Sequence, residues 1–132
     1  MRRVASLAFL ALAMASPVQA QGGVEVDTNL ICDTQKQVEQ FVSLFKGDVT
    51  SAEAAIAAVN AEHGRPEACV IATTAYRHAG PVATISNAEA TFDVVRIIVV
   101  GVYTLTGFEP SLPSEFFTPI PRDGSGTVGS RP

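Results

Sequence analysis

Two cysteines, Cys32 and Cys69, constrain what this chain can fold into more than any other pair of residues, and they are its only cysteines. In an oxidising compartment, two lone thiols of a small domain most often pair. A bridge across such a long loop removes about 4 kcal/mol of unfolded-state entropy in the chain-entropy model. That is a large share of the total stability of a small domain, which is about 5–15 kcal/mol. We therefore expect a structural disulfide.

A reactive or metal-bound thiol is the alternative use of these cysteines. Metal and redox sites typically show close spacings such as C-x-x-C or H-x-x-x-H, and neither occurs in the chain. The G-x-S-x-G and H-E-x-x-H motifs and the P-loop are absent as well. The sequence therefore predicts no metal, no cofactor and no catalytic residue.

The first 20 residues have the organisation of a secretory signal peptide. Arg2 and Arg3 precede an apolar run over residues 4–15, and Val18 and Ala20 are small side chains at the −3 and −1 positions of a cleavage site. The apolar run is shorter than the roughly 20 residues that a membrane-spanning helix needs. We therefore expect residues 1–20 to be removed and the remaining domain to be periplasmic or secreted, with no membrane anchor.

The charge of that remaining domain narrows the range of partners. Removing Arg2 and Arg3 from the nine basic residues leaves seven against 13 acidic ones, a formal net charge of −6. Binding to nucleic acid depends on lysine and arginine displacing counterions from phosphates. The composition therefore disfavours nucleic acids and anionic membranes as partners.

A helix is predicted over residues 33–46. Thr34 and Gln37 have the spacing of a capping box, and Gly47 is a natural stop. Four apolar residues follow the i, i+3, i+4, i+7 pattern of one helix face: Val38, Phe41, Val42 and Phe45.

A second helix is predicted over residues 52–62. Thr50 and Glu53 again have capping-box spacing, and Gly64 with Pro66 ends the pattern. A thin apolar stripe on this helix allows a neighbour to approach closely: Ala52, Ala55, Ile56 and Val59. The short connection predicts an antiparallel helix hairpin.

The residues after Cys69 have the pattern of strands. Residues 70–76 and 82–85 are expected to pair through a turn at residues 78–81, and residues 86–89 form the next turn. Residues 91–104 are rich in Val and Ile on both faces and are interrupted by Arg96, which is typical of a central strand. Gly101 in this strand marks a bulge or a close approach. After a proline-rich loop at residues 107–113, a last strand is expected over residues 115–120, with Pro119 at its edge or end.

The sequence thus predicts one α+β domain over residues 30–121, between a flexible leader at 21–29 and a disordered tail at 122–132. The leader could contain a short strand at residues 24–26. A two-helix hairpin packs on a mostly antiparallel sheet of three or four strands. A small SH3-like curled barrel with the helices outside it is the alternative.

Four residues are candidates for a binding surface. Tyr76, Arg77 and His78 place an aromatic ring, a cation and a titratable ring next to each other, and tyrosine and arginine are favoured at interfaces. Strand alternation puts Tyr76 and His78 on one face and Arg77 on the other. Arg96 interrupts the most apolar strand, so it reaches solvent, pairs with an acid such as Asp93 or Glu115, or binds an anion.

The arrangement resembles a group of small exported proteobacterial proteins of uncharacterised function, over roughly residues 30–120. The resemblance implies no activity, cofactor or catalytic residue. The residues that carry it are Cys32, residues 37–41, residues 58–61, Cys69, residues 94–102 and residues 116–118.

The leading functional hypothesis is a non-enzymatic domain that binds a protein partner or a copy of itself. One alternative is a small hydrolase that uses His63 or His78, which needs a carboxylate or hydroxyl within reach of the imidazole. Another is a small-ligand carrier, which needs a cavity between helices and sheet.

Overall fold

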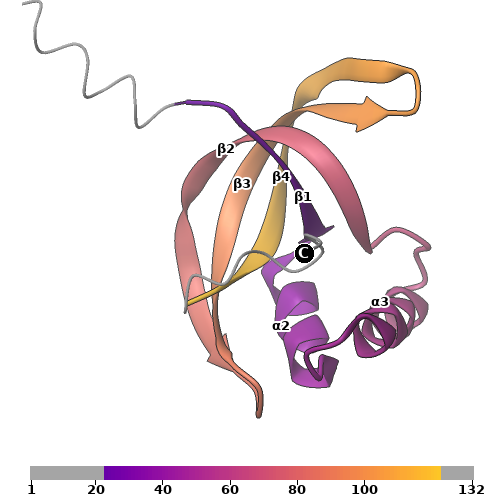
Figure 1. Ribbon diagram of the computed structural model, residues 1–132, viewed down its shortest axis with the longest axis vertical. Coiled ribbons are helices and arrows are strands. Elements are labelled where there is room, and N and C mark those ends of the chain that lie inside the picture. The colour runs from indigo at the N-terminus through magenta and orange to yellow at the C-terminus, as the bar shows by residue number, and fades with distance from the viewer. Residues whose placement is uncertain (1–22, 123–132) are drawn as a thin grey trace, which may run out of the picture.

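The computed structural model describes residues 23–122, so the predicted signal peptide and nearly all of the predicted tail lie outside this range. The elements follow one another as β1 (Glu25–Cys32), α2 (Gln35–Leu44), α3 (Val49–His63), β2 (Cys69–Ser86), β3 (Thr91–Thr104) and β4 (Gly107–Pro121). The strand pairs are antiparallel, and the helix pair packs against the sheet (Figure 1). The predicted α+β class is confirmed.

The sheet curls and closes on itself in the order β1-β2-β3-β4. β4 meets β1 at a single register pair, Cys32 with Phe117. Beside it, the Thr118 hydroxyl donates a 2.7 Å hydrogen bond to the Leu30 carbonyl. The four strands therefore form a barrel whose seam between β1 and β4 is joined at one end.

Side chains from the two faces of the sheet form two separate apolar clusters, because neighbouring residues of a strand point in opposite directions. One cluster combines strands with both helices: Leu30, Cys32, Val38, Phe41, Val42, Ala52, Ala55, Val59, Cys69, Phe92 and Val94. The other comes from strands alone: Ile31, Tyr76, Val95, Ile97 and Val99. The strand-only cluster lies on one face of the sheet, and the helices cover the other face.

Helix α2 begins with the capping box that the sequence predicts. The Thr34 hydroxyl accepts a hydrogen bond from the Gln37 amide (3.2 Å), and the Gln37 side chain accepts one from the Thr34 amide (3.0 Å). Val38, Phe41 and Val42 on this helix are fully buried. Since α2 contacts all four strands, it joins the barrel to α3.

Helix α3 begins one turn earlier than predicted, and its cap is Asp48 rather than Thr50. The Asp48 carboxylate accepts a 2.7 Å hydrogen bond from the Ser51 amide, which holds the pKa of that carboxyl below its usual value. A carboxylate also interacts favourably with the positive end of the helix dipole, so Asp48 competes better for this position than a hydroxyl does. The predicted end is confirmed, with Gly64 in the left-handed conformation (φ 65°).

The turn predicted at residues 78–81 is wrong. β2 continues through these residues to Ser86 and pairs with β3 along the way. Gly80, with φ of 109°, and Pro81 lie where the register shifts, so they form an irregularity in one long strand. Glycine and proline accommodate a bulge as readily as a turn, which explains the incorrect prediction.

The predicted loop at residues 107–113 is also wrong, because β4 begins at Gly107 and pairs with the end of β3. Proline is tolerated in a strand whose amide edge has no partner, and Pro110 and Pro113 lie where β4 has β3 on one side only. The close approach expected at Gly101 is present, because a Cβ atom there would lie 2.3 Å from the Phe108 ring.

The domain also extends beyond both of its predicted ends. Residues 25–29, assigned to the leader, belong to β1, where each residue has a register partner in β2. Arg122, assigned to the tail, donates from its amide to the Thr91 carbonyl and from its side chain to Asp93, both at 2.9 Å. Pairing with distant strands orders these segments.

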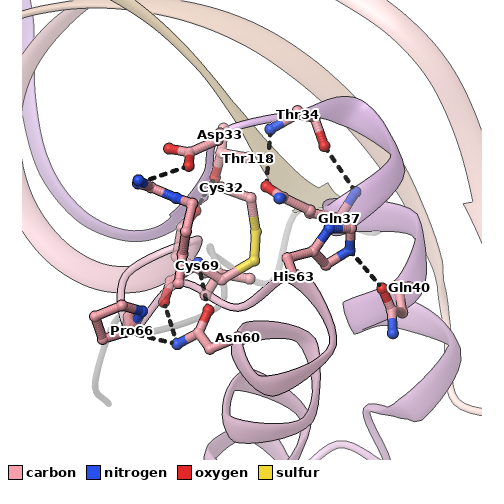
Figure 2. Close-up of a disulfide and its surroundings, with 12 residues drawn as sticks. Cys32, Asp33, Thr34, Gln37, Gln40, Asn60, His63, Pro66, Cys69 and Thr118 are labelled. Atoms are coloured by element: carbon pink, nitrogen blue, oxygen red, sulfur yellow. Dashed lines mark hydrogen bonds and ion pairs between the residues drawn. A yellow bond between two sulfur atoms is a disulfide. The ribbon is translucent and has the colours of Figure 1, made fainter.

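The predicted disulfide between Cys32 and Cys69 joins directly opposite residues at the end of β1 and the start of β2 (Figure 2). Both residues are buried. Asn60 of α3 attaches to the same place, accepting a bond from the Cys69 amide (2.8 Å) and donating bonds to the carbonyls of Cys69 (3.1 Å) and Pro66 (2.9 Å). The disulfide and Asn60 together link the helix pair to two strands.

Replacing both Cys32 and Cys69 with alanine is expected to lower the free energy of unfolding by about 4 kcal/mol. The reason is that the cross-link, which spans 37 positions, no longer restricts the unfolded chain. Urea denaturation of the two proteins measures the difference. Denaturing the unaltered protein under reducing conditions separates the cross-link from the packing of the sulfur atoms, and an unchanged midpoint there contradicts the prediction.

Candidate functional site

A polar cluster lies on one face of β1 and β2. The register places Glu25 opposite Tyr76 and Asp27 opposite Thr74. Residues two apart on a strand share a face, which adds one more residue on each strand. We call these six residues the β1–β2 polar cluster: Glu25, Asp27, Asn29, Thr74, Tyr76 and His78.

Hydrogen bonds connect the outer half of the cluster. The Tyr76 hydroxyl donates to a Glu25 carboxylate oxygen at 3.4 Å, and the other oxygen lies 3.3 Å from His78 Nε2. The rings of Tyr76 and His78 meet edge to face, with centroids 5.5 Å apart. The structure thus brings together two of the predicted binding residues, whereas Arg77 lies on the opposite face by strand alternation.

Tyr76 is the buried member of this group. Burial of its hydroxyl raises the pKa of Tyr76 above the ordinary 10.0, and the negative charges of Glu25 and Asp27 add to the effect. A hydrogen bond from the Asn29 side chain opposes it. Tyr76 therefore stays a neutral donor to Glu25 at ordinary pH.

Two buried oxygens of the cluster, Asn29 Oδ1 and Thr74 Oγ1, have no hydrogen-bond partner. The sequence analysis missed both residues, together with Glu25 and Asp27. A signal was present, because polar residues occupy every second position from 25 to 29, which is the period of a strand. The two nearby glycines favoured a flexible leader instead.

Arg96 forms one of the predicted ion pairs. Its Nη1 lies 3.0 Å from a Glu115 carboxylate oxygen on the neighbouring strand, and both side chains are partly exposed. Asp93, the other proposed partner, is instead 2.9 Å from Nε of Arg122. The hydrogen bond from Arg122 is the main cause that lowers the pKa of Asp93.

His63 faces α2 rather than an acid. Its Nε2 lies 3.2 Å from Oε1 of Gln40 (Figure 2). The Nε2 of Gln40 donates to a Glu62 carboxylate oxygen. The hydrolase hypothesis requires a carboxylate or hydroxyl against the imidazole. Among the two histidines, His78 rather than His63 has such a partner.

A second candidate surface is the projecting end of the β3–β4 hairpin, at the opposite end of the molecule from the helices (Figure 1). Leu105 is fully exposed and Leu112 is 85% exposed. Tyr103 and Phe108, which are about half exposed, are register partners whose ring centroids lie 5.0 Å apart. We call these four residues the hairpin surface; the sequence analysis placed residues 107–113 in a loop.

Two solvent-open hollows are further candidates. The larger, about 500 Å³, is formed by the end of α2, the connecting loop and α3, and its lining includes Leu44, Lys46 and Ala55. The smaller, about 350 Å³, lies at residues 89–91 and Arg122. The larger hollow has no lining residue from the sheet, so it is not the cavity between helices and sheet that a ligand carrier requires.

Within residues 23–122, no three His, Cys, Asp or Glu side chains are grouped as ligands for a metal ion. None of the helices in this range has the length and apolar character needed to cross a membrane. The chain matches no protein-family model, no curated protein and no solved structure. The function therefore has to be inferred from the two surfaces themselves.

Replacing Tyr103 with phenylalanine leaves Tyr76 as the only tyrosine, so its ionisation can be followed by near-ultraviolet absorbance. We expect the phenolate to form above the ordinary pKa of 10.0 in the folded protein. Because the folded state retains this proton more strongly, Tyr76 costs no stability below the unfolded-state pKa and lowers stability as the pH rises above it. Ionisation at or below the ordinary value contradicts the prediction, and Tyr76→Phe with Tyr103 intact is the control.

Proposed function

We propose that this chain is exported and that the part after residue 20 is a disulfide-linked, non-enzymatic domain that acts by binding protein. The partner we propose is a second copy of the same chain, bound through the hairpin surface. The exposure of Leu105 and Leu112 at the end of the hairpin is the observation that carries the proposal. Large apolar side chains grouped in contact with water are typical of interaction sites.

The shape of the hairpin favours packing of faces over addition of a strand. Main-chain pairing along the free edge of β4 is limited by Pro110 and Pro113, which lack an amide hydrogen. Tyr103 and Phe108 instead present their rings on one face. The Phe108 ring packs directly over Gly101, where a side chain would collide with it. Aromatic side chains held in this way are favoured anchors of interfaces.

Charge favours a second copy as the occupant. Most symmetric oligomers are two-fold dimers, in which the same patch meets itself. A patch carrying net charge would repel its own copy, and this is an acidic protein. Glu109 is the only charged residue between Tyr103 and Leu112, and strand alternation turns it away from the aromatic face. The hairpin surface can therefore pack on itself without like charges meeting.

The His78–Glu25 contact supports the hydrolase alternative. A general base needs its proton-accepting nitrogen directed at the nucleophile or at a water molecule. Here Nε2 of His78 is directed at a carboxylate, and its side chain is 40% exposed. Both side chains of this contact are largely exposed, so the hydrolase alternative has less support than binding through the hairpin surface.

Self-association can be tested by measuring mass against concentration in an analytical ultracentrifuge, with protein purified after expression of the full chain. We expect a dimer for the unaltered protein. Replacing Leu105 and Phe108 with serine should raise the dimer dissociation constant by about 30-fold or more, the factor for losing a hot spot of about 2 kcal/mol.

A matched control replaces two exposed valines far from the hairpin surface, Val49 and Val82, with serine. This variant should dimerise normally, and circular dichroism checks that both variants are folded. A monomeric unaltered protein at every concentration contradicts self-association. Equal weakening in the control contradicts the location, and binding to phospholipid vesicles without dimerisation identifies a different occupant.

Export can be tested by intact mass spectrometry of the protein from the periplasm and the medium, without reduction. The proposed cleavage after Ala20 predicts a chain that begins at Gln21. The pairing of Cys32 with Cys69 predicts a mass that rises by two hydrogens on reduction. A protein that is found in the cytoplasm with residues 1–20 attached contradicts the export proposal.

A further inference from the structure

The inner half of the β1–β2 polar cluster has unmet hydrogen-bonding capacity. Asn29 is 1% exposed and Thr74 is fully buried, yet Asn29 Oδ1 and Thr74 Oγ1 have no partner. Buried polar atoms are paired in the great majority of native proteins, because an unpaired one has lost its hydrogen bonds to water without a replacement. Two such atoms in one cluster indicate that a bound group completes the site.

The bonds already present define what that group must supply. Asn29 Oδ1 is a side-chain amide oxygen, which accepts hydrogen bonds and does not donate them. The Tyr76 hydroxyl donates its hydrogen bond to Glu25. Asn29 Oδ1 can only accept and Thr74 Oγ1 can accept as well, so a group that pairs with both atoms is a hydrogen-bond donor.

Charge specifies the donor further. Asp27 lies directly opposite Thr74 and shares a strand face with Asn29, and Glu25 is the next residue on that face. The basic side chain of the cluster is His78, which contacts Glu25 and not Asp27. A positively charged donor would thus satisfy the two buried oxygens and balance Asp27 at once.

A donor can reach the cluster along the seam between β1 and β4. Along β1, the register pairing with β4 is confined to Cys32, so the edge from residue 25 to residue 29 has no paired strand on that side. Asp27 is half-buried and the Glu25 side chain is 55% exposed. The acidic residues therefore lie nearer to solvent than Asn29 and Thr74, which lie deeper.

We propose that Asp27, Asn29 and Thr74, with Glu25 at the entrance, bind a primary ammonium group. The three hydrogens of an ammonium group match one carboxylate, one amide oxygen and one hydroxyl oxygen. Either a free amine or a lysine side chain supplies this chemistry. The site is separate from the hairpin surface, and the inference does not depend on self-association.

The test is a titration with methylammonium chloride, followed by nuclear magnetic resonance of isotopically labelled protein. Tetramethylammonium chloride is the control ligand, since it has the same charge and no N–H donor. We expect methylammonium alone to shift the Asn29 side-chain signal and the Thr74 amide signal. Equal shifts with both salts, or none with either, overturn the proposal.

Variants test which residues hold the ammonium group. Asp27→Asn keeps the size of the side chain and removes its charge, and it should weaken methylammonium binding by about tenfold, equivalent to about 1.4 kcal/mol. Asp33→Asn makes the same charge change beside Arg65, away from the cluster, and should leave binding unchanged. Equal effects of the two variants would show nonspecific attraction to an acidic protein and overturn the site.

The variant Thr74→Val tests whether the Thr74 hydroxyl binds the ammonium group or only a water molecule. Valine has nearly the same shape without the hydroxyl, so the variant should fold and should bind methylammonium more weakly. Binding that Thr74→Val and Asp27→Asn leave unchanged overturns the proposal. Tighter binding of N-acetyl-lysine amide than of methylammonium identifies a lysine side chain as the source, and the reverse order identifies a free amine.

Discussion

The pairing of β1 with β2, locked by the Cys32–Cys69 disulfide, is the constraint on which the rest of the structure depends. A slip of one residue would turn every side chain of β1 to the other face of the sheet. Leu30 would leave the cluster that the helices cover, and Asp27 would leave its place opposite Thr74. Because the cysteines are directly opposite each other, the covalent bond holds one register. The same bond therefore maintains both the core and the polar cluster.

Local chemistry made several elements predictable from the sequence. The Thr34–Gln37 capping box, the apolar face of α2 and the bounds of β3 depend on residues close together in the chain, and the structure confirms each. The predictions failed where distant residues decide. Residues 25–29 and 107–113 are strands because β2 and β3 lie beside them. The glycines that precede residue 25, and the glycine and prolines within residues 107–113, locally favour irregular structure.

The residues of the candidate site also fall into those that local sequence predicts and those that distant contacts determine. Tyr76 and His78 could be predicted because residue type and strand alternation place them on one face. Their acidic partner Glu25 lies 51 positions from Tyr76 in the sequence, so no spacing rule connects them. The unpaired oxygens of Asn29 and Thr74 are a property of three-dimensional packing alone. The hairpin surface was missed because recognising it required β4 to begin at Gly107.

The single junction at the barrel seam has a consequence for the order in which the molecule assembles. The disulfide links positions 37 apart, whereas the bond from Thr118 to Leu30 spans 88 positions and needs the last strand. Longer loops cost more entropy to close, and distant pairings form more slowly. In a chain that becomes available from its N-terminus onward, the disulfide between Cys32 and Cys69 can therefore form around the two helices before β4 has paired. The barrel would close only when nearly the whole chain is available.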